Sequence, residues 1–277
     1  MNNNEQRLRA LWGASKLPFQ ESDYDFFDYP ELQQAAQTLE RYIGMKASGL
    51  LTGPNGCGKT VLLDHVLYEL SESQYCIIRL SHTTLTGSDM IRRLCRLNGL
   101  TTSIRRSDNL HQLLEFWRTD GRIPVLAVDE AQNLTPATLE ELRLLNCERT
   151  RTCGRDSISP FVLLLCGDDD LVPMIELNIH RSLRSRLTFH VRVQPFTPEC
   201  TENYCSFRWK QVGVQVNPFN MQAMTLLQTA SEGLPRAINQ IAANALFSAL
   251  DSQQKVITAE HVQNALKLTP WIGRHNR

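Results

Sequence analysis

The chain has 277 residues, 42% of them hydrophobic and 21% charged, and its 29 Lys and Arg residues balance its 29 Asp and Glu residues. This composition is typical of a globular protein and excludes an intrinsically disordered chain. No apolar run approaches the ~20 residues needed to cross a bilayer, the first residues lack the pattern of a signal peptide, and the eight cysteines show no zinc-binding or disulfide-framework spacing. We therefore expect a cytoplasmic protein with no membrane partner, built from one larger and one smaller domain.

The first region, residues 1–48, is expected to contain an irregular arm and then a helix over 32–43, where apolar residues recur at helical spacing. Between residues 49 and 195, short apolar strands alternate with helices. The expected strands are 49–52, 76–80, 124–128, 161–166 and 188–193, and the expected helices are 59–70, 89–98, 110–119 (capped by Asp108) and 136–146. This alternation predicts an α/β domain whose parallel sheet is covered by helices on both faces.

The strand pattern ends after Pro195. Helical patterns cover residues 199–211, 218–231, 234–250 and 258–268, and Gly233 and Pro235 separate the second of these from the third. The sequence therefore predicts a smaller helical domain over residues 196–277, after the α/β domain over residues 49–195.

A glycine-rich turn follows the first expected strand. Its pattern is G-x-x-x-x-G-K-[ST], formed by Gly53, Pro54, Asn55, Gly56, Cys57, Gly58, Lys59 and Thr60, and Val61 continues into the helix. Such glycines let backbone N–H groups face a triphosphate at the start of a helix. Lys59 is expected to reach the β- and γ-phosphates, and the Thr60 hydroxyl to bind Mg²⁺. We therefore predict ATP and Mg²⁺ as cofactors, with residues 53–61 in contact with the nucleotide.

Two carboxylates end the most apolar of the expected strands. Asp129 is expected to hold the magnesium shell, and Glu130, which follows it, to polarise the attacking water. A strand that ends in Asp-Glu is common by itself. This strand, however, follows the phosphate-binding turn after one intervening strand with its flanking helices, which is where a carboxylate can reach the magnesium ion. The pair therefore predicts an ATPase that forms ADP and phosphate.

Several short sequence motifs together resemble those of the AAA+ ATPases. They are Pro18-Phe19, Leu50-Leu51-Thr52-Gly53, Asp129-Glu130-Ala131-Gln132-Asn133-Leu134, Leu139-Glu140-Glu141-Leu142-Arg143-Leu144-Leu145 and Gly233-Leu234-Pro235-Arg236-Ala237-Ile238-Asn239. Within that family they are similar to the ExeA-like (general secretion pathway A) branch and to the transposition ATPases of the TniB, TnsC, IstB and MuB types. The resemblance implies a P-loop AAA+ sheet followed by a helical lid domain.

The resemblance also implies roles for residues outside these two motifs. Arg236 matches the sensor-2 arginine of the lid, which is expected to contact the γ-phosphate. Arg184 or Arg186 is expected to act as an arginine finger on the nucleotide of a neighbouring subunit, which implies a homo-oligomer, either a ring or a helical filament. Asp168 occupies the sensor-1 position, where relatives carry Gln or Thr, so its role in placing the water is left open.

Arginine is concentrated in a few stretches of the chain. Residues 79–106 hold six arginines against a single acid, Asp89. Arginine suits bidentate contact with phosphate, and phosphate contacts give DNA binding that is independent of base sequence and sensitive to salt. The residues predicted to contact double-stranded DNA are Arg92, Arg93, Arg96, Arg105 and Arg106. The alternative is that the first three of them form the solvent face of an amphipathic helix.

These features favour a regulator of DNA transposition that assembles with ATP on target DNA and recruits or activates a transposase. The alternative is a secretion ATPase of the ExeA kind, which typically continues past the lid through a membrane helix into a peptidoglycan-binding region. Because this sequence ends at Arg277, we expect the transposition role. Other AAA+ roles, such as helicase loading or defence, are a third possibility. The oligomer number, the partner transposase and the target-site preference are left open.

Overall fold

The computed structural model describes residues 3–20, 26–81, 86–147 and 159–272. The chain divides into two compact units, which we call the sheet unit and the helical unit. The sheet unit comprises residues 30–53 and 59–193, and the helical unit comprises residues 1–29, 54–58 and 194–277. The first 29 residues thus belong with the C-terminal helices and residues 30–48 with the sheet, whereas the sequence-based boundaries kept residues 1–48 apart.

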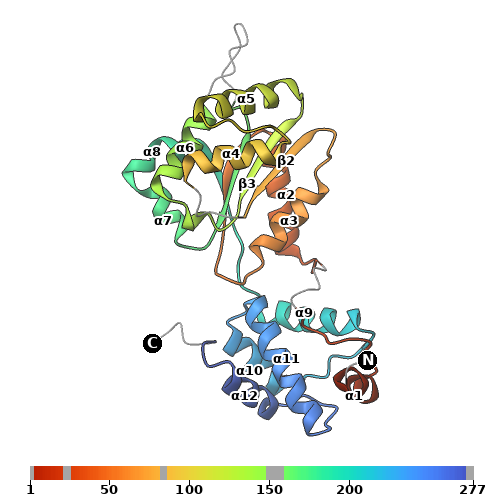
Figure 1. Cartoon of the computed structure of the whole chain (residues 1–277). Helices are drawn as coiled ribbons and strands as arrows, with labels where there is room; N and C mark the ends of the chain where they lie inside the picture. Colours follow the sequence, from red (N-terminus) through yellow and green to blue (C-terminus); the bar gives the residue numbers. More distant parts are fainter. Residues whose placement is uncertain (1–2, 21–25, 82–85, 148–158, 273–277) are drawn as a thin grey trace. The chain divides into compact units, whose positions relative to one another are not determined.

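A five-stranded parallel sheet in the order β2-β3-β4-β1-β5 forms the centre of the sheet unit (Figure 1). Its strands are β1 (Ser48–Thr52), β2 (Tyr75–Leu80), β3 (Ile123–Val128), β4 (Val162–Gly167) and β5 (Leu187–Arg192). β1 and β4 are buried along their whole length, as strands in a sheet covered on both faces must be. The predicted parallel α/β sheet is therefore confirmed.

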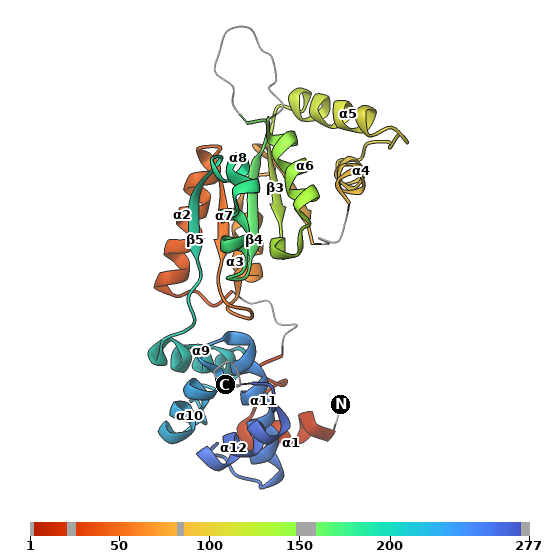
Figure 2. The same cartoon turned by 90° about the vertical axis from the view of Figure 1, so that its left-hand side faces the viewer.

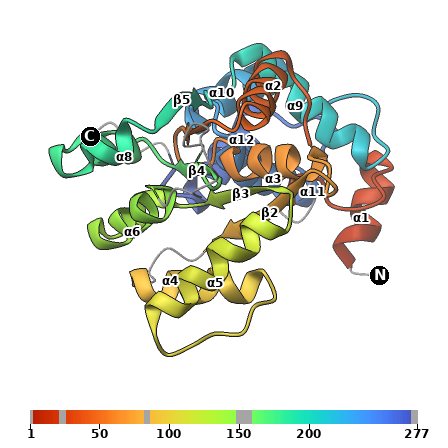
Figure 3. The same cartoon turned by 90° about the horizontal axis from the view of Figure 1, so that it is seen from above.

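Helices cover both faces of this sheet. α2 (Pro30–Gly44) and α3 (Lys59–Glu69) lie on one side, and α4 (Gly87–Leu97), α5 (Arg106–Thr119) and α6 (Pro136–Cys147) lie on the other (Figures 2 and 3). On the second side, apolar residues of the helices and strands form one buried cluster. Two short helices, α7 (Leu171–Glu176) and α8 (Arg181–Arg184), precede β5 in a stretch for which the sequence predicted no element.

The helical unit consists of α1 (Asn3–Trp12), α9 (Pro198–Gln211), α10 (Met221–Ser231), α11 (Pro235–Asp251) and α12 (Ala259–Leu268). The sequence predicted an irregular arm where α1 forms. Leu8 of α1 is 1% exposed in the core of this unit, and Arg7 donates a hydrogen bond of 3.1 Å to the Leu250 carbonyl. Packing against α11 therefore stabilises a helix whose own apolar pattern is weak.

Two helix starts differ from the prediction. α5 begins at Arg106, so Asp108 lies inside its first turn, and the predicted cap is wrong. α10 begins at Met221 and not at residue 218, because Phe219 pairs with Ile257 in an isolated β-bridge. Asn220 then caps this helix by accepting a hydrogen bond of 2.8 Å from the Ala223 amide.

No helix in the described part of the chain combines the length and the hydropathy of a membrane-spanning segment. The seven cysteines among the described residues are free thiols. Burial raises the pKa of both the Cys76 and the Cys166 thiol, which keeps these two side chains neutral.

Candidate active site

The glycine-rich turn leads from β1 into α3. Gly56 (φ 83°) and Gly58 (φ 99°) adopt the left-handed backbone conformation that favours glycine. Lys59 begins α3, is 6% exposed, and donates a hydrogen bond of 2.9 Å from Nζ to the Gly53 carbonyl oxygen. The first N–H groups of α3 have no acceptor within the helix. The turn thus places a buried cation at the start of a helix, which is the arrangement that anions bind.

Arg236 lies beside the middle of this turn. Residues 54–58 belong to the helical unit, and the Arg236 amide at the start of α11 donates a hydrogen bond of 3.2 Å to the Gly56 carbonyl. A Cβ atom at Gly56 would lie 2.9 Å from the Arg236 Cβ, so the close approach also requires glycine there. Arg236 therefore contacts the glycine-rich turn within one unit, and its predicted contact with a γ-phosphate stays a prediction.

Asp129 is a buried carboxylate at the end of β3, with 6% of the residue exposed. Its Oδ2 accepts hydrogen bonds from Thr60 Oγ1 (3.0 Å) and Arg79 Nη2 (3.1 Å), and its Oδ1 accepts one from the Glu130 amide (3.0 Å). β4 lies between β1 and β3 in the sheet, yet Thr60 and Asp129 meet at its carboxyl edge. A hydroxyl and a carboxylate oxygen at this distance are ligands that suit Mg²⁺.

Arg79 also lies at this site, although we predicted no role for it from the sequence. It also forms an ion pair with Asp64 of α3. Burial opposes its charge, but the bonds to Asp64 and Asp129 prevail and raise the pKa of Arg79. The available signal was a single charged residue in the otherwise apolar strand 76–80. Its partners depend on the pairing of β2 with β3, which sequence order does not reveal.

Glu130 is exposed and has a left-handed backbone, with φ 52° and ψ 39°. Gln132 Nε2 donates a hydrogen bond of 2.7 Å to Glu130 Oε2, and Gln132 Oε1 accepts one of 3.3 Å from the Asp168 amide. Asp168 Oδ1 in turn accepts a hydrogen bond of 3.1 Å from the Asp170 amide, and Asp169 forms a two-bond ion pair with Arg192. The three consecutive acids at the end of β4 therefore have different surroundings.

The two finger candidates lie just before β5 and differ in their bonds. Arg184 Nη1 donates a hydrogen bond of 2.8 Å to the Glu176 carbonyl. Arg186 is exposed, and its side chain has no hydrogen bond or ion pair to any described residue. Of the two, only Arg184 is bonded to a described residue through its guanidinium, and the role of either as a finger stays a prediction.

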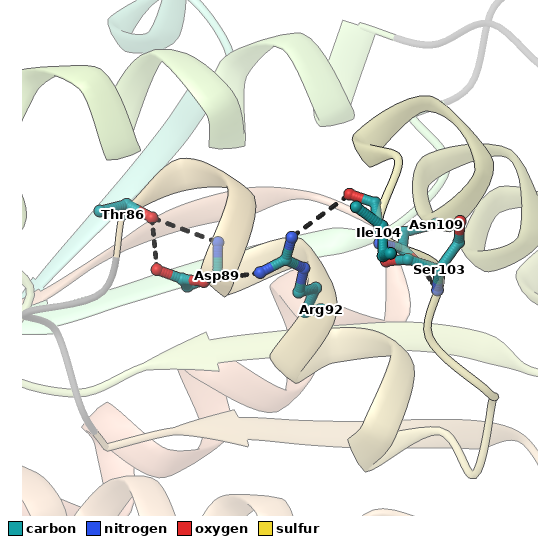
Figure 4. Close-up of polar contacts among 6 residues, drawn as sticks. All are labelled: Thr86, Asp89, Arg92, Ser103, Ile104 and Asn109. Atoms are coloured by element: carbon teal, nitrogen blue, oxygen red, sulfur yellow. Dashed lines mark hydrogen bonds and ion pairs between the residues drawn. The ribbon is translucent and has the colours of Figure 1, made fainter.

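The five predicted DNA contacts also fall into two groups. Arg92 is tied to Asp89 (3.3 Å) and to the Ile104 carbonyl (3.3 Å), as Figure 4 shows, and Arg106 forms an ion pair with Glu141 of α6. The other three side chains are exposed and make no hydrogen bond or ion pair to the rest of the described structure; they are Arg93, Arg96 and Arg105.

A short loop between α4 and α5 is held in place by polar contacts (Figure 4). The Ser103 amide donates to Asn109 Oδ1 (2.7 Å), and Asn109 Nδ2 donates back to the Ser103 carbonyl (2.9 Å). Asn109 is fully buried, whereas Ile104 at the tip of the loop is 92% exposed. We call the loop over residues 98–105, which includes Arg105, together with Arg93 and Arg96 of α4, the arginine tip.

Residues 44–175 match the family model of an AAA domain. The chain is 28% identical over 250 residues to General secretion pathway protein A of Aeromonas hydrophila, a match that covers 86% of this chain and 44% of that protein. The chain thus spans less than half the length of this relative.

Many solved structures resemble this one, and two of them show the extent of the similarity. Cdc6p from Pyrobaculum aerophilum has a TM-score of 0.70 and 20% identity, over 90% of this chain and 70% of that one. The Aeropyrum pernix ORC1 protein, solved in complex with DNA, has a TM-score of 0.66 and 15% identity, over 90% of this chain and 68% of that one. These similarities confirm the predicted P-loop AAA+ fold, a parallel sheet with flanking helices followed by a helical C-terminal region.

Proposed function

We propose that this protein hydrolyses ATP with Mg²⁺ and acts as an oligomer on double-stranded DNA. The observation that carries the ATPase part is the 3.0 Å hydrogen bond between Thr60 and Asp129, with Glu130 next in the chain. The hydroxyl and the carboxylate fit a magnesium ion, and an adjacent carboxylate that reaches solvent suits a general base for water.

The residues of the turn and of the strand ends have different roles in this proposal. Lys59 and the backbone N–H groups of Gly53 and of residues 55–61 bind the phosphates, Thr60 and Asp129 hold Mg²⁺, and Glu130 takes the proton of the attacking water. Bound Mg²⁺ supplies Lewis-acid stabilisation of the phosphate charge. Lys59 exchanges its bond to Gly53 for the nucleotide when ATP binds.

Residues outside the two motifs complete this proposal. Arg236 contacts the γ-phosphate as a sensor, and Arg186, with Arg184 as the second choice, reaches the nucleotide of the next subunit. Asp168, just after β4, senses the state of the site in this proposal, and the hydrogen bonds from its amide to Gln132 and from Gln132 to Glu130 support that role.

The DNA part rests on the arginine tip. Three exposed guanidinium groups, two on α4 and one on the loop that follows it, can each contact a phosphate without losing an internal ion pair. The ORC1 protein that this fold resembles was solved in complex with DNA. Arg92 and Arg106 hold α4, α5 and α6 together and do not contact DNA in this proposal.

Among DNA-linked roles we favour regulation of transposition, in which the ATP-bound assembly recruits or activates a transposase in the cytoplasm. The short sequence motifs that resemble those of the transposition ATPases support this role. A secretion-pathway ATPase is the second candidate, and the 28% identity to General secretion pathway protein A favours it.

Electron microscopy of the purified protein with duplex DNA and a slowly hydrolysed ATP analogue, with each alone, and with neither tests the proposal. We expect assemblies on DNA that require the nucleotide, and phosphate release when ATP replaces the analogue. Nucleotide-dependent assembly without any DNA binding at low salt would favour the secretion role. A protein that neither binds nor hydrolyses ATP would contradict the whole proposal.

A further inference from the structure

Gln132 connects the ends of two neighbouring strands, β3 and β4, which lie far apart in the sequence. It lies in the short 3₁₀ turn Ala131–Asn133 that follows β3. Its amide nitrogen donates to Glu130 Oε2 at 2.7 Å, and its amide oxygen accepts from the Asp168 amide at the end of β4 at 3.3 Å. One side chain thus joins the proposed general base to the tip of the neighbouring strand.

The chemistry of the three groups fixes the orientation of this amide. A carboxylate only accepts hydrogen bonds and a backbone N–H only donates them. A reversed amide would place oxygen against the Glu130 carboxylate and NH₂ against the Asp168 N–H, and both bonds would be lost. The bridge therefore has one arrangement, and a glutamine at this position is suited to both ends of it.

Gly167 provides a second, independent observation. Its φ is not in the left-handed region, so the backbone itself does not demand glycine. A Cβ atom there would lie 2.6 Å from Gln132 Oε1 and 2.9 Å from a methyl carbon of Leu171. The glycine at the end of β4 thus leaves the space that the Gln132 amide fills.

Glu130 is held from its other side as well. Its left-handed backbone is uncommon for a residue with a side chain, and the bond from its amide to Asp129 Oδ1 (3.0 Å) stabilises it. The backbone is therefore fixed by Asp129 and the carboxylate by Gln132. The second carboxylate oxygen, Oε1, remains to accept a proton.

We propose that Gln132 is a positioning residue that orients the Glu130 carboxylate and couples it to the tip of β4. This inference rests on the proposed ATPase function. When the Asp168 segment shifts, the bridge moves with it, and Glu130 gains or loses the orientation in which it takes a proton from water.

Three variants test the inference. Gln132→Ala removes both bonds, Gln132→Glu keeps an acceptor for the Asp168 amide but places a carboxylate against Glu130, and Gln37→Ala is a control at an exposed glutamine of α2. We expect both Gln132 variants to lower kcat by about tenfold or more, the size expected for a lost hydrogen bond to a charged group. The Kd for ATP stays within about twofold, because no phosphate contact is lost.

A readout without turnover separates positioning from folding. Hydrogen exchange of the Asp168 amide in the nucleotide-free protein should become faster in Gln132→Ala and remain slow in Gln132→Glu. The space at Gly167 gives a further check. Gly167→Ala should lower kcat, and combining it with Gln132→Ala should add little, because both changes break the same bridge.

The outcomes distinguish the two levels of the proposal. A wild-type protein without ATP hydrolysis overturns the proposed function and this inference together. If the wild type hydrolyses ATP and both Gln132 variants match it in kcat, the inference alone is wrong. A fall in kcat accompanied by an equal loss of ATP affinity would also overturn it, since Gln132 would then act on binding and not on Glu130.

Discussion

The charged groups at the carboxyl edge of the sheet and those of the arginine tip differ in how they are compensated. At the sheet edge, Lys59 and Asp129 are buried, and each is bonded to a carbonyl, a hydroxyl or an opposite charge. At the arginine tip, three guanidinium groups are exposed and have no bond to any described residue.

Burial explains why the two regions differ. An unpaired charge in the protein interior costs several kcal/mol, so the sheet edge must carry its own counter-charges before any ligand arrives. An exposed arginine costs little when it is unpaired. At the sheet edge, the hydrogen-bond partners within the protein therefore indicate which contacts a nucleotide and Mg²⁺ would replace. The three arginines of the arginine tip have no such partners among the described residues, so only an experiment with an added polyanion can test their role.

The largest effect is expected from Lys59→Ala. The variant loses a charge-assisted phosphate contact, which corresponds to an affinity about 100-fold weaker for ATP, and it should lose nucleotide-dependent assembly as well. Titration with a fluorescent ATP analogue measures this. Lys210→Ala, at an exposed position of α9, is the control and should bind ATP as the wild type does. Unchanged binding by Lys59→Ala would remove the sheet edge from the proposed nucleotide site.

Glu130→Gln should separate binding from chemistry. A general base contributes about 10²- to 10⁴-fold to a rate, so turnover should fall by about that factor while ATP affinity is kept. Assemblies on DNA should then persist after ATP is added. Phosphate release and the lifetime of the assemblies measure the two effects, with Glu69→Gln on the exposed face of α3 as the control. Normal turnover would show that another group activates the water.

DNA binding through the arginine tip should weaken as the salt concentration rises. Changing Arg93, Arg96 and Arg105 together to Gln should reduce the slope of log K against log salt by up to about 2.7, since each phosphate contact contributes about 0.9. Arg92→Gln should leave this slope unchanged and lower the melting temperature instead, because its bonds are internal. Fluorescence anisotropy with duplex DNA at several salt concentrations measures the slope. An unchanged slope in the triple variant would exclude the tip as the DNA contact.

The strands and the two motifs were predictable because each is a local pattern. Short segments rich in apolar residues marked the five strands, and Lys59, Thr60, Asp129 and Glu130 stood in motifs whose chemistry fixes the residue types. The structure places Thr60 and Asp129 in contact, although 69 residues separate them in the chain. It does not test their roles, which stay predictions.

The rest depends on contacts between distant segments. Arg79 reaches Asp129 only because β2 pairs with β3, and Gln132 reaches Asp168 only because β4 lies beside β3. The five arginines looked alike in the sequence, but the Arg106 side chain pairs with Glu141, 35 residues away, and Arg105 does not. Helix α1 was missed for the same reason, since its core contact is with residues near the other end of the chain.

The smallest predicted effect concerns His190, a group between the two extremes. It is exposed, yet its Nε2 shares a hydrogen bond of 2.7 Å with the buried Thr52 at the end of β1. Partial burial, followed by the charge of Arg192, lowers its pKa, while Asp169 opposes the shift. The folded protein therefore favours the neutral ring.

The sign of the effect follows from this shift. The unfolded chain binds a proton more readily, so the contribution of His190 to stability is present above its ordinary pKa of 6.5 and is lost as the pH falls from there through the lower folded pKa. Denaturant unfolding at several pH values should show a smaller acid-induced loss in His190→Gln than in the wild type. His261 of the helical unit, whose pKa burial also lowers, remains in both proteins and cancels in this comparison. An identical pH dependence in the two proteins would mean that the edge of the sheet at Thr52 tolerates a charged ring as readily as the exposed arginine tip tolerates its cations.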